Sequence, residues 1–252
     1  MAPPTPVLQA DLFARGSPRV TRDDHAQRIW LDEASWYDVR RRFVRGADAL
    51  FHELCGRLAW RAATRRMYDR MVDVPRLTAD LRSASAELPA IVGDIGDVVS
   101  QLYGVPLRLD LAAYYRDGRD SVAWHADRVD LSRPEHTSAI VSLGGPRRLC
   151  IRPKGGGRSH AITLASGDAL VLGGAIQHRF EHCVPKVRRA PARISLLAFG
   201  AFADEPPPEH YRFVQSPAVP SAASAVGLGD GARRARSGRA GERPAAGDPS
   251  SV

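Results

Sequence analysis

The chain has 252 residues, a hydrophobic fraction of 44% and a formal net charge of +8. This length allows one sizeable domain with appendages, and no apolar run approaches the roughly eighteen residues that a membrane-spanning helix needs. The N-terminus lacks the charged and then apolar pattern of a signal peptide, and the three cysteines have neither disulfide-framework nor zinc-finger spacing. We therefore expect a cytoplasmic, monomeric protein without a membrane anchor.

Arginine supplies nearly all of the 36 basic residues, since only Lys154 and Lys186 are lysines. A surface rich in guanidinium groups suits phosphate backbones, because each planar group binds phosphate through two hydrogen bonds. A compositional bias that replaces lysine by arginine throughout explains the choice of arginine equally well. The net positive charge stands under either interpretation and favours a nucleic-acid partner.

The first hundred residues are predicted to be mainly helical. Residues 1–30 carry scattered proline and charge, which indicates an irregular N-terminal arm. Residues 34–58 place large apolar side chains at helical spacing, with Ser35 as a possible N-cap. A second helix is expected within residues 87–104, where apolar residues share one face and Gly104 is a suitable C-terminal stop.

After Pro106 the pattern changes to short β-type runs that are separated by turn residues. These runs cover residues 107–115, 121–125, 138–143, 147–153, 160–164, 168–174, 179–184 and 192–199. Their spacing predicts an α+β fold, in which a sandwich or barrel has the helices packed outside it. The domain would span residues 31–215, helical to about 105 and with its β core at about 106–200, and residues 216–252 would form a disordered tail.

Three residues are candidates for a metal site. His125 and Asp127 are two positions apart, so on a strand their side chains would point to the same face, and His182 lies on a later predicted strand. Two histidines and one carboxylate form the facial triad of non-haem Fe(II) oxygenases. A lone His-x-Asp triplet is more often a surface ion pair or a satisfied core pair, and His178, four residues before His182, is a rival third ligand.

Several motifs, taken together, resemble the AlkB-like family of Fe(II)/2-oxoglutarate-dependent dioxygenases, which repair alkylated nucleic-acid bases. They are "YYRDGRDSVAWHADR", "AIVSLGGPRRLCIRPKGGG", "SGDALVLGG", "HCVPK" and "PARISLLAFG". The resemblance implies a double-stranded β-helix, or jelly roll, with Fe(II) as cofactor and 2-oxoglutarate and O₂ as cosubstrates. It also implies that His125, Asp127 and His182 hold the iron, because the family's distal histidine precedes an apolar–proline element, as His182 does in "HCVP".

The resemblance assigns the cosubstrate to Tyr115 and Arg193, which match the family's partners for the far carboxylate of 2-oxoglutarate. Three positions depart from the family's pattern: Ser195 and Ala113 replace asparagines, and Phe199 stands where a second arginine belongs. Ser195 is nevertheless a third candidate for binding the cosubstrate. Each lost charge-assisted contact weakens binding by about ten- to a hundredfold. Either another arginine, such as Arg147 or Arg148, compensates from a neighbouring strand, or the protein uses 2-oxoglutarate poorly or not at all. Use of a different keto acid is a further alternative.

The segment Arg65 to Ala79 resembles the family's nucleotide-recognition lid. Met67, Tyr68, Pro75 and Arg76 would then flank the substrate base and backbone. The alternative is that the apolar members of this segment only cover the barrel.

These features predict oxidative demethylation of N-alkylated bases in DNA or RNA, in the repair of alkylation damage. Two alternatives remain at this point. One is an oxygenase of the same chemistry with another substrate, and the other is a non-catalytic nucleic-acid-binding protein with a weakened 2-oxoglutarate site.

Overall fold

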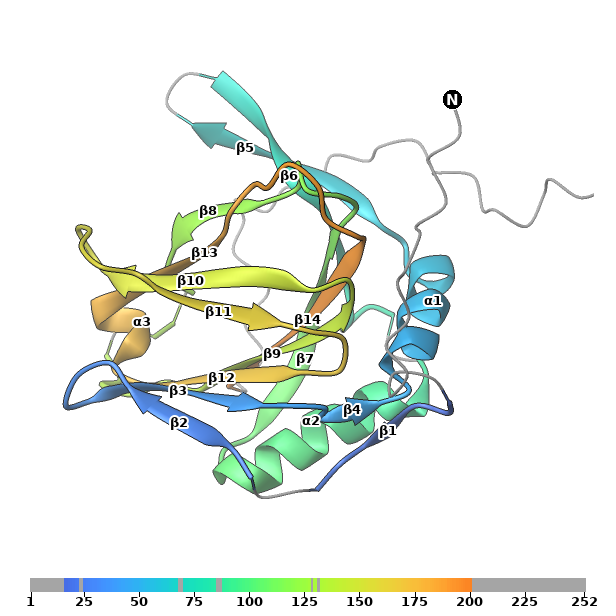
Figure 1. Ribbon diagram of the computed structural model, residues 1–252, viewed down its shortest axis with the longest axis horizontal. Coiled ribbons are helices and arrows are strands. Elements are labelled where there is room, and N and C mark those ends of the chain that lie inside the picture. The colour runs from blue at the N-terminus through green and yellow to red at the C-terminus, as the bar shows by residue number, and fades with distance from the viewer. Residues whose placement is uncertain are drawn as a thin grey trace, which may run out of the picture. The chain divides into compact units, whose positions relative to one another are not determined.

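The computed structural model describes residues 16–22, 25–67, 70–84, 88–127, 129–130 and 132–200. Two antiparallel sheets face each other, as Figure 1 shows, and this is the arrangement of a jelly roll. The eight-stranded sheet has the order β2-β3-β12-β9-β14-β7-β6-β5, and the four-stranded sheet has the order β11-β10-β13-β8. A short pair, β1 and β4, lies apart from both sheets.

The strands are β1 (Arg19–Val20), β2 (Gln27–Trp30), β3 (Ser35–Arg40), β4 (Val44–Arg45), β5 (Arg61–Met67), β6 (Arg70–Asp80), β7 (Leu107–Tyr115), β8 (Val122–His125), β9 (Ser138–Gly144), β10 (Arg147–Pro153), β11 (His160–Leu164), β12 (Ala169–Gly174), β13 (Phe180–Val184) and β14 (Arg193–Gly200). The helices are α1 (Ala47–Arg57), α2 (Ala90–Tyr103) and α3 (Ile176–Arg179). The strands β7 to β14 lie where the eight β-type runs after Pro106 were expected, so that prediction is confirmed.

The helix expected over residues 34–58 begins only at Ala47, and the prediction is wrong for its first half. Ser35 is not an N-cap, because it opens β3, which pairs with β2 on one side and with β12 on the other. Tyr37 and Val39 pack between the sheets, whereas Phe43 packs against the helices. A strand with both faces buried shows no polar–apolar alternation, and its apolar residues imitated the helical period.

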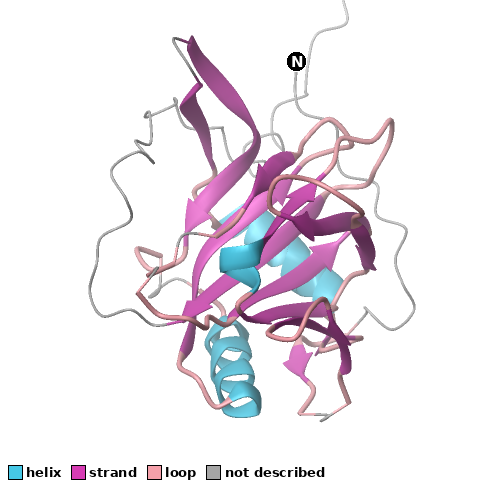
Figure 2. Ribbon diagram, turned by 90° about the vertical axis from the view of Figure 1, so that its left-hand side faces the viewer, coloured by secondary structure: helices cyan, strands magenta, loops and turns pink. Residues whose placement is uncertain are grey.

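The expectation of a mainly helical first hundred residues is likewise wrong, because β1 to β6 all lie before Leu81. The expected irregular arm contains β1 and β2. The lid-like segment forms part of a hairpin of β5 and β6, which extends past the neighbouring strands in Figure 1 and Figure 2. The helix α2 is confirmed, and Gly104 ends it in the left-handed conformation. The tail 216–252 lies outside the described residues.

Two hydrophobic clusters hold the sheets in place. One fills the space between the sheets with side chains that include Ile140, Ile151 and Leu170. The other joins the outer face of the large sheet to α1 and α2, and includes Leu50, Ile95 and Ile194. Both faces of β14 and β9 are therefore covered. Of the described helices, none is long and apolar enough to cross a membrane.

Two glycines with the same backbone angle provide a test of this packing. Gly155 and Gly167 both have φ +85°, but a Cβ at Gly155 would meet nothing within 4 Å, whereas one at Gly167 would lie 2.2 Å from the Val44 carbonyl oxygen. We expect Gly155→Ala to cost about 1–2 kcal/mol of unfolding free energy, from the backbone angle alone. Gly167→Ala should cost about 3 kcal/mol or more, because β4 must also move. Equal losses in urea denaturation would contradict the tight β4 contact.

Candidate metal centre

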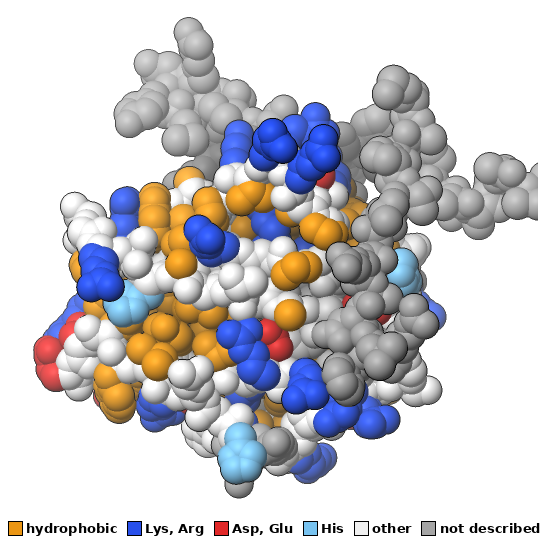
Figure 3. Space-filling model, in the orientation of Figure 1, with side chains coloured by type: hydrophobic (Ala, Val, Ile, Leu, Met, Phe, Trp, Pro, Cys, Tyr) orange, Lys and Arg blue, Asp and Glu red, His pale blue; other side chains and the backbone are white. Residues whose placement is uncertain are grey.

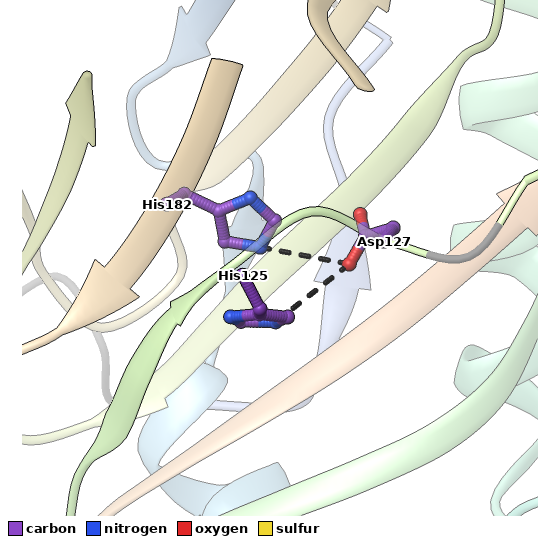
Figure 4. A group of neighbouring side chains, drawn as sticks. All are labelled: His125, Asp127 and His182. Carbon is purple, nitrogen blue, oxygen red and sulfur yellow. Dashed lines mark ion pairs between the residues drawn. The ribbon is translucent and has the colours of Figure 1, made fainter. Parts of the chain in front are cut away.

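The two strands β8 and β13 bring His125 and His182 opposite each other. The two residues are paired across these strands, and their ring centroids are 4.3 Å apart. Asp127 follows the end of β8 rather than lying on it, so the same-strand argument for its direction is wrong. Its Oδ1 nevertheless lies 3.9 Å from Nε2 of His125 and 3.5 Å from Nε2 of His182, as Figure 4 shows.

The Asp127 carboxylate is held by two neighbouring side chains. Gln177, at the buried side of α3, donates from Nε2 to Oδ2 of Asp127 at 2.7 Å and accepts from the Asp127 backbone N–H at 2.8 Å. Ser138 donates its hydroxyl to the same Oδ2 at 3.2 Å. These bonds occupy Oδ2 and leave Oδ1 directed at the two imidazoles. A carboxylate fixed in this way can bind a metal through one oxygen.

Burial acts on one of the two imidazoles, and a backbone contact orients the other. Burial lowers the pKa of His182 to about 4, although the charge of Asp127 acts in the opposite direction, so its imidazole is neutral. His125 donates from Nδ1 to the Ala123 carbonyl oxygen at 2.9 Å, because a carbonyl can only accept, and its Nε2 is the ring nitrogen that faces Asp127. Neutral imidazoles are the form in which histidine binds metals.

The donor set suits Fe(II). One ligand atom from each of His125, Asp127 and His182 lies within 4.8 Å of the others, and within the described ranges these residues form the one such cluster of His, Cys, Asp and Glu. Two imidazoles and a carboxylate leave the remaining coordination positions open to other ligands. His178 is not part of the cluster: it lies on α3, not on the strand of His182, and its Nε2 contacts the Arg133 carbonyl oxygen at 2.8 Å.

A family model described as the 2OG-Fe(II) oxygenase superfamily matches residues 17–214. The chain belongs to the 2OG-Fe(II) oxygenase superfamily. Membership implies a dioxygenase that uses Fe(II), 2-oxoglutarate and O₂, and a His-Asp-His cluster that could hold a metal ion is present.

Within the superfamily, the oxygenase is AlkB-like. It is 27% identical over 167 residues to alpha-ketoglutarate-dependent dioxygenase alkB homolog 3 of Bos taurus, with 57% of each chain covered. It is 26% identical over 86 residues to the uncharacterized protein R406 of Acanthamoeba polyphaga mimivirus, which covers 34% of this chain and 44% of that protein. The chain thus spans about half the length of these curated relatives.

The solved structure of OsALKBH1 has the same fold. It aligns with a TM-score of 0.50 at 15% identity, and the alignment covers 70% of this chain and all of that one. The two facing sheets of this chain therefore have the same jelly-roll arrangement as that structure.

The residues expected to bind the cosubstrate lie together on the inner face of the large sheet. Arg193 on β14 is paired with Tyr115 on β7, and Ser195 is paired with Ala113. Arg193 is fully buried, its Nε donates to the Ser142 hydroxyl at 3.1 Å, and its Nη1 and Nη2 have no partner among the described residues. Burial lowers the pKa of Arg193 to about 10, so the side chain is still charged at neutral pH.

Arg147 and Arg148 do not compensate for the missing second arginine. The Arg147 guanidinium is occupied, because it donates to the carbonyl oxygens of Asp117, Asp120 and Pro185 at 2.8–2.9 Å. Arg148, the next residue on β10, is exposed. Neither of the two arginines named as examples therefore takes the place of the missing one.

The four residues expected at the substrate belong to the β5–β6 hairpin region. Arg76 and Pro75 lie on β6, and Arg76 is buried with only 8% of its surface exposed. Met67 ends β5, where only the backbone is described, and Tyr68 lies outside the described residues. The buried position of Arg76 is unlike that of a residue on the surface of a lid.

Three residues near the site escaped the sequence analysis. Gln177 and Ser138 hold Asp127, and Thr78 lies opposite Ala113 on the inner face. The pattern "QHRFEH" contains Gln177, but a glutamine in a sequence does not by itself indicate a contact with a metal ligand. Its partner, Asp127, is 50 residues away in the chain.

Removal of the triad residues should remove iron binding. We expect His125→Ala, Asp127→Ala and His182→Ala each to abolish Fe(II) binding in anaerobic titrations, because each change removes one of three protein ligands. The His178→Ala variant is the control and should keep the parent's affinity. Loss of affinity in His178→Ala, with full retention in His182→Ala, would identify the other histidine as the ligand.

Gln177 should act as a positioning residue for the metal ligand. We expect Gln177→Met to weaken Fe(II) binding by about ten- to a hundredfold, because Asp127 loses the bond that orients its carboxylate. The midpoint of urea unfolding without metal, measured in parallel, separates this effect from a loss of stability. If both quantities fall together, or the affinity is unchanged, Gln177 does not orient the ligand.

Proposed function

We propose that this protein is an Fe(II)/2-oxoglutarate-dependent dioxygenase that oxidatively demethylates N-alkylated bases in nucleic acid. One observation carries the chemistry: a fixed His-Asp-His cluster and a fully buried, partly unpaired arginine both face the space between the two sheets. The similarity to alkB homolog 3 and the net charge of +8 support a nucleic-acid substrate.

His125, Asp127 and His182 would hold the metal. When bound, iron and 2-oxoglutarate supply the activation of O₂ for hydroxylation of the N-alkyl carbon, after which the carbon–nitrogen bond breaks and an aldehyde leaves. Burial lowers the pKa of His182 to about 4, so its imidazole is neutral near pH 7. Gln177 and Ser138 keep Asp127 in the orientation that binding requires.

Arg193 would anchor the far carboxylate of 2-oxoglutarate. Its Nη1 and Nη2 are buried and unpaired among the described residues, and a buried guanidinium is stabilised most by a carboxylate that accepts two parallel hydrogen bonds. Tyr115 lies beside it, with the Arg193 Cζ 5.6 Å from the ring centroid. Ser195, two residues along β14, faces the same space.

The substrate would be a flipped or single-stranded base, because a base inside a duplex cannot reach an inner face between two sheets. Lys and Arg side chains are spread over the face seen in Figure 3, whereas Asp and Glu side chains are few there. Strand β5 at the edge of the large sheet adds Arg61. Such a distribution suits binding to phosphate backbones.

A non-catalytic nucleic-acid-binding protein is the second candidate, and Ala113 and Phe199 favour it because both remove polar groups from the cosubstrate region. The two candidates differ in turnover. Only the dioxygenase converts 2-oxoglutarate to succinate.

The assay that tests the proposal uses single-stranded DNA that carries N-methylated adenine or cytosine. With Fe(II), 2-oxoglutarate and air, we expect formaldehyde and succinate in equal amounts, and neither product from the His182→Ala variant. The matched RNA strand decides between the two nucleic acids. Succinate without formaldehyde would indicate another substrate, and the absence of both products, together with binding of the oligonucleotide, would support the binding protein.

A further inference from the structure

Buried polar atoms without partners gather on one face of three adjacent strands. Among the described residues, seven buried side-chain N and O atoms lack a hydrogen-bond partner. Two of them are Nη1 and Nη2 of Arg193 on β14. Three more lie on β6: Nε and Nη1 of Arg76 and Oγ1 of Thr78. A buried polar atom that nothing satisfies destabilises the folded state. Their concentration in one place indicates a polar ligand rather than scattered defects of packing.

The strand register places these groups on the inner face. Thr78 is paired with Ala113, which is paired with Ser195, so the three side chains form one row across β6, β7 and β14. Arg76 lies two residues before Thr78 on β6 and therefore points to the same side of the sheet. Ala113 and Tyr115 on this face pack against Val184 of β13 and Val122 of β8 in the opposite sheet.

Arg76 is attached to the part of the fold that carries the metal ligands. The Ser121 backbone N–H, just before β8, donates to the Pro75 carbonyl oxygen at 2.7 Å, and β8 ends in His125. Strand β6 is also in contact with β8. Arg193, by contrast, has Arg147 and Tyr115 as its electrostatic neighbours. The register places the two arginines on either side of Tyr115, because Tyr115 is paired with Arg193, and Tyr114 is paired with Leu77, the residue after Arg76.

Ala113 contributes only a small side chain to the inner face between these residues. It is 2% exposed and lies between the hydroxyl-bearing residues Ser195 and Thr78, so only a methyl group stands between their side chains in this row. A larger side chain at position 113 would separate Thr78 on β6 from Ser195 on β14.

We propose that Arg76, assisted by Thr78, binds the metal-proximal carboxylate of 2-oxoglutarate and replaces the second arginine that Phe199 removes. Arg193 then holds the far carboxylate alone. This inference rests on the proposed function, because it assumes that 2-oxoglutarate is the cosubstrate. It makes Arg76 a cosubstrate residue and not a residue of the nucleotide lid.

Calorimetric titration of the anaerobic Fe(II)-loaded protein with 2-oxoglutarate and with pyruvate, which lacks the far carboxylate, tests the inference. We expect Arg76→Met to weaken the binding of both keto acids by about ten- to a hundredfold. Arg193→Met should weaken 2-oxoglutarate binding by a similar factor and leave pyruvate binding unchanged. Thr78→Val, which keeps the side-chain shape, should weaken both ligands by a smaller factor.

The exposed Arg148→Met is the matched control and should bind both ligands like the parent. Fe(II) affinity should be unchanged in Arg76→Met, since the residue is not a ligand, and this readout also shows that the variant is folded. Unchanged 2-oxoglutarate affinity in Arg76→Met overturns the inference, as does a loss confined to binding of single-stranded DNA. A loss for 2-oxoglutarate but not for pyruvate would place Arg76 at the far carboxylate. If the parent itself does not bind 2-oxoglutarate, the proposed function fails instead.

Discussion

A fully buried guanidinium without an anionic partner is the constraint on which the inner face depends. Arg193 has no exposed surface, stays charged at neutral pH and, within the described part of the chain, satisfies only its Nε. Removing a charge from water costs several kcal/mol unless a paired group restores the interaction. The fold can keep Arg193 there because β14 is paired on both sides, with β9 and β7, and cannot move to expose it. The large sheet therefore presents a buried positive charge that an anionic ligand would stabilise.

The metal cluster and the Arg193 charge face the same space because each sheet contributes different residues to it. The small sheet supplies both histidines through the β8–β13 pair, and α3, directly before β13, supplies Gln177, which fixes Asp127. The large sheet supplies Arg193 and, in our proposal, Arg76. A ligand with a chelating end and a carboxylate end fits between such surfaces. In this account, Ala113 does not weaken the site but makes room for groups from β6.

The β core was predictable from the sequence because its strands are short and separated by glycine-rich turns, as between β11 and β12 at Gly167. The strand β3 was not, since Tyr37 and Val39 face one core while Trp36 faces the other, and the result imitates a helix. His125, Asp127 and His182 could be selected as candidates from spacing and motif. Their contacts could not, because Gln177 and Asp127 meet only through the fold. Arg76 looked like a lid residue, and only its burial and unpaired atoms changed that interpretation.

The most direct measurement of the central claim is the visible absorbance of the anaerobic protein during titration with Fe(II) and 2-oxoglutarate together. The account predicts a metal-to-ligand charge-transfer band that saturates at one equivalent of each and requires both, because the keto acid must chelate an iron held by the triad. The band should disappear in Asp127→Ala. A protein that binds Fe(II) but develops no band with saturating 2-oxoglutarate would contradict the claim that the buried arginines and the His-Asp-His cluster form one site.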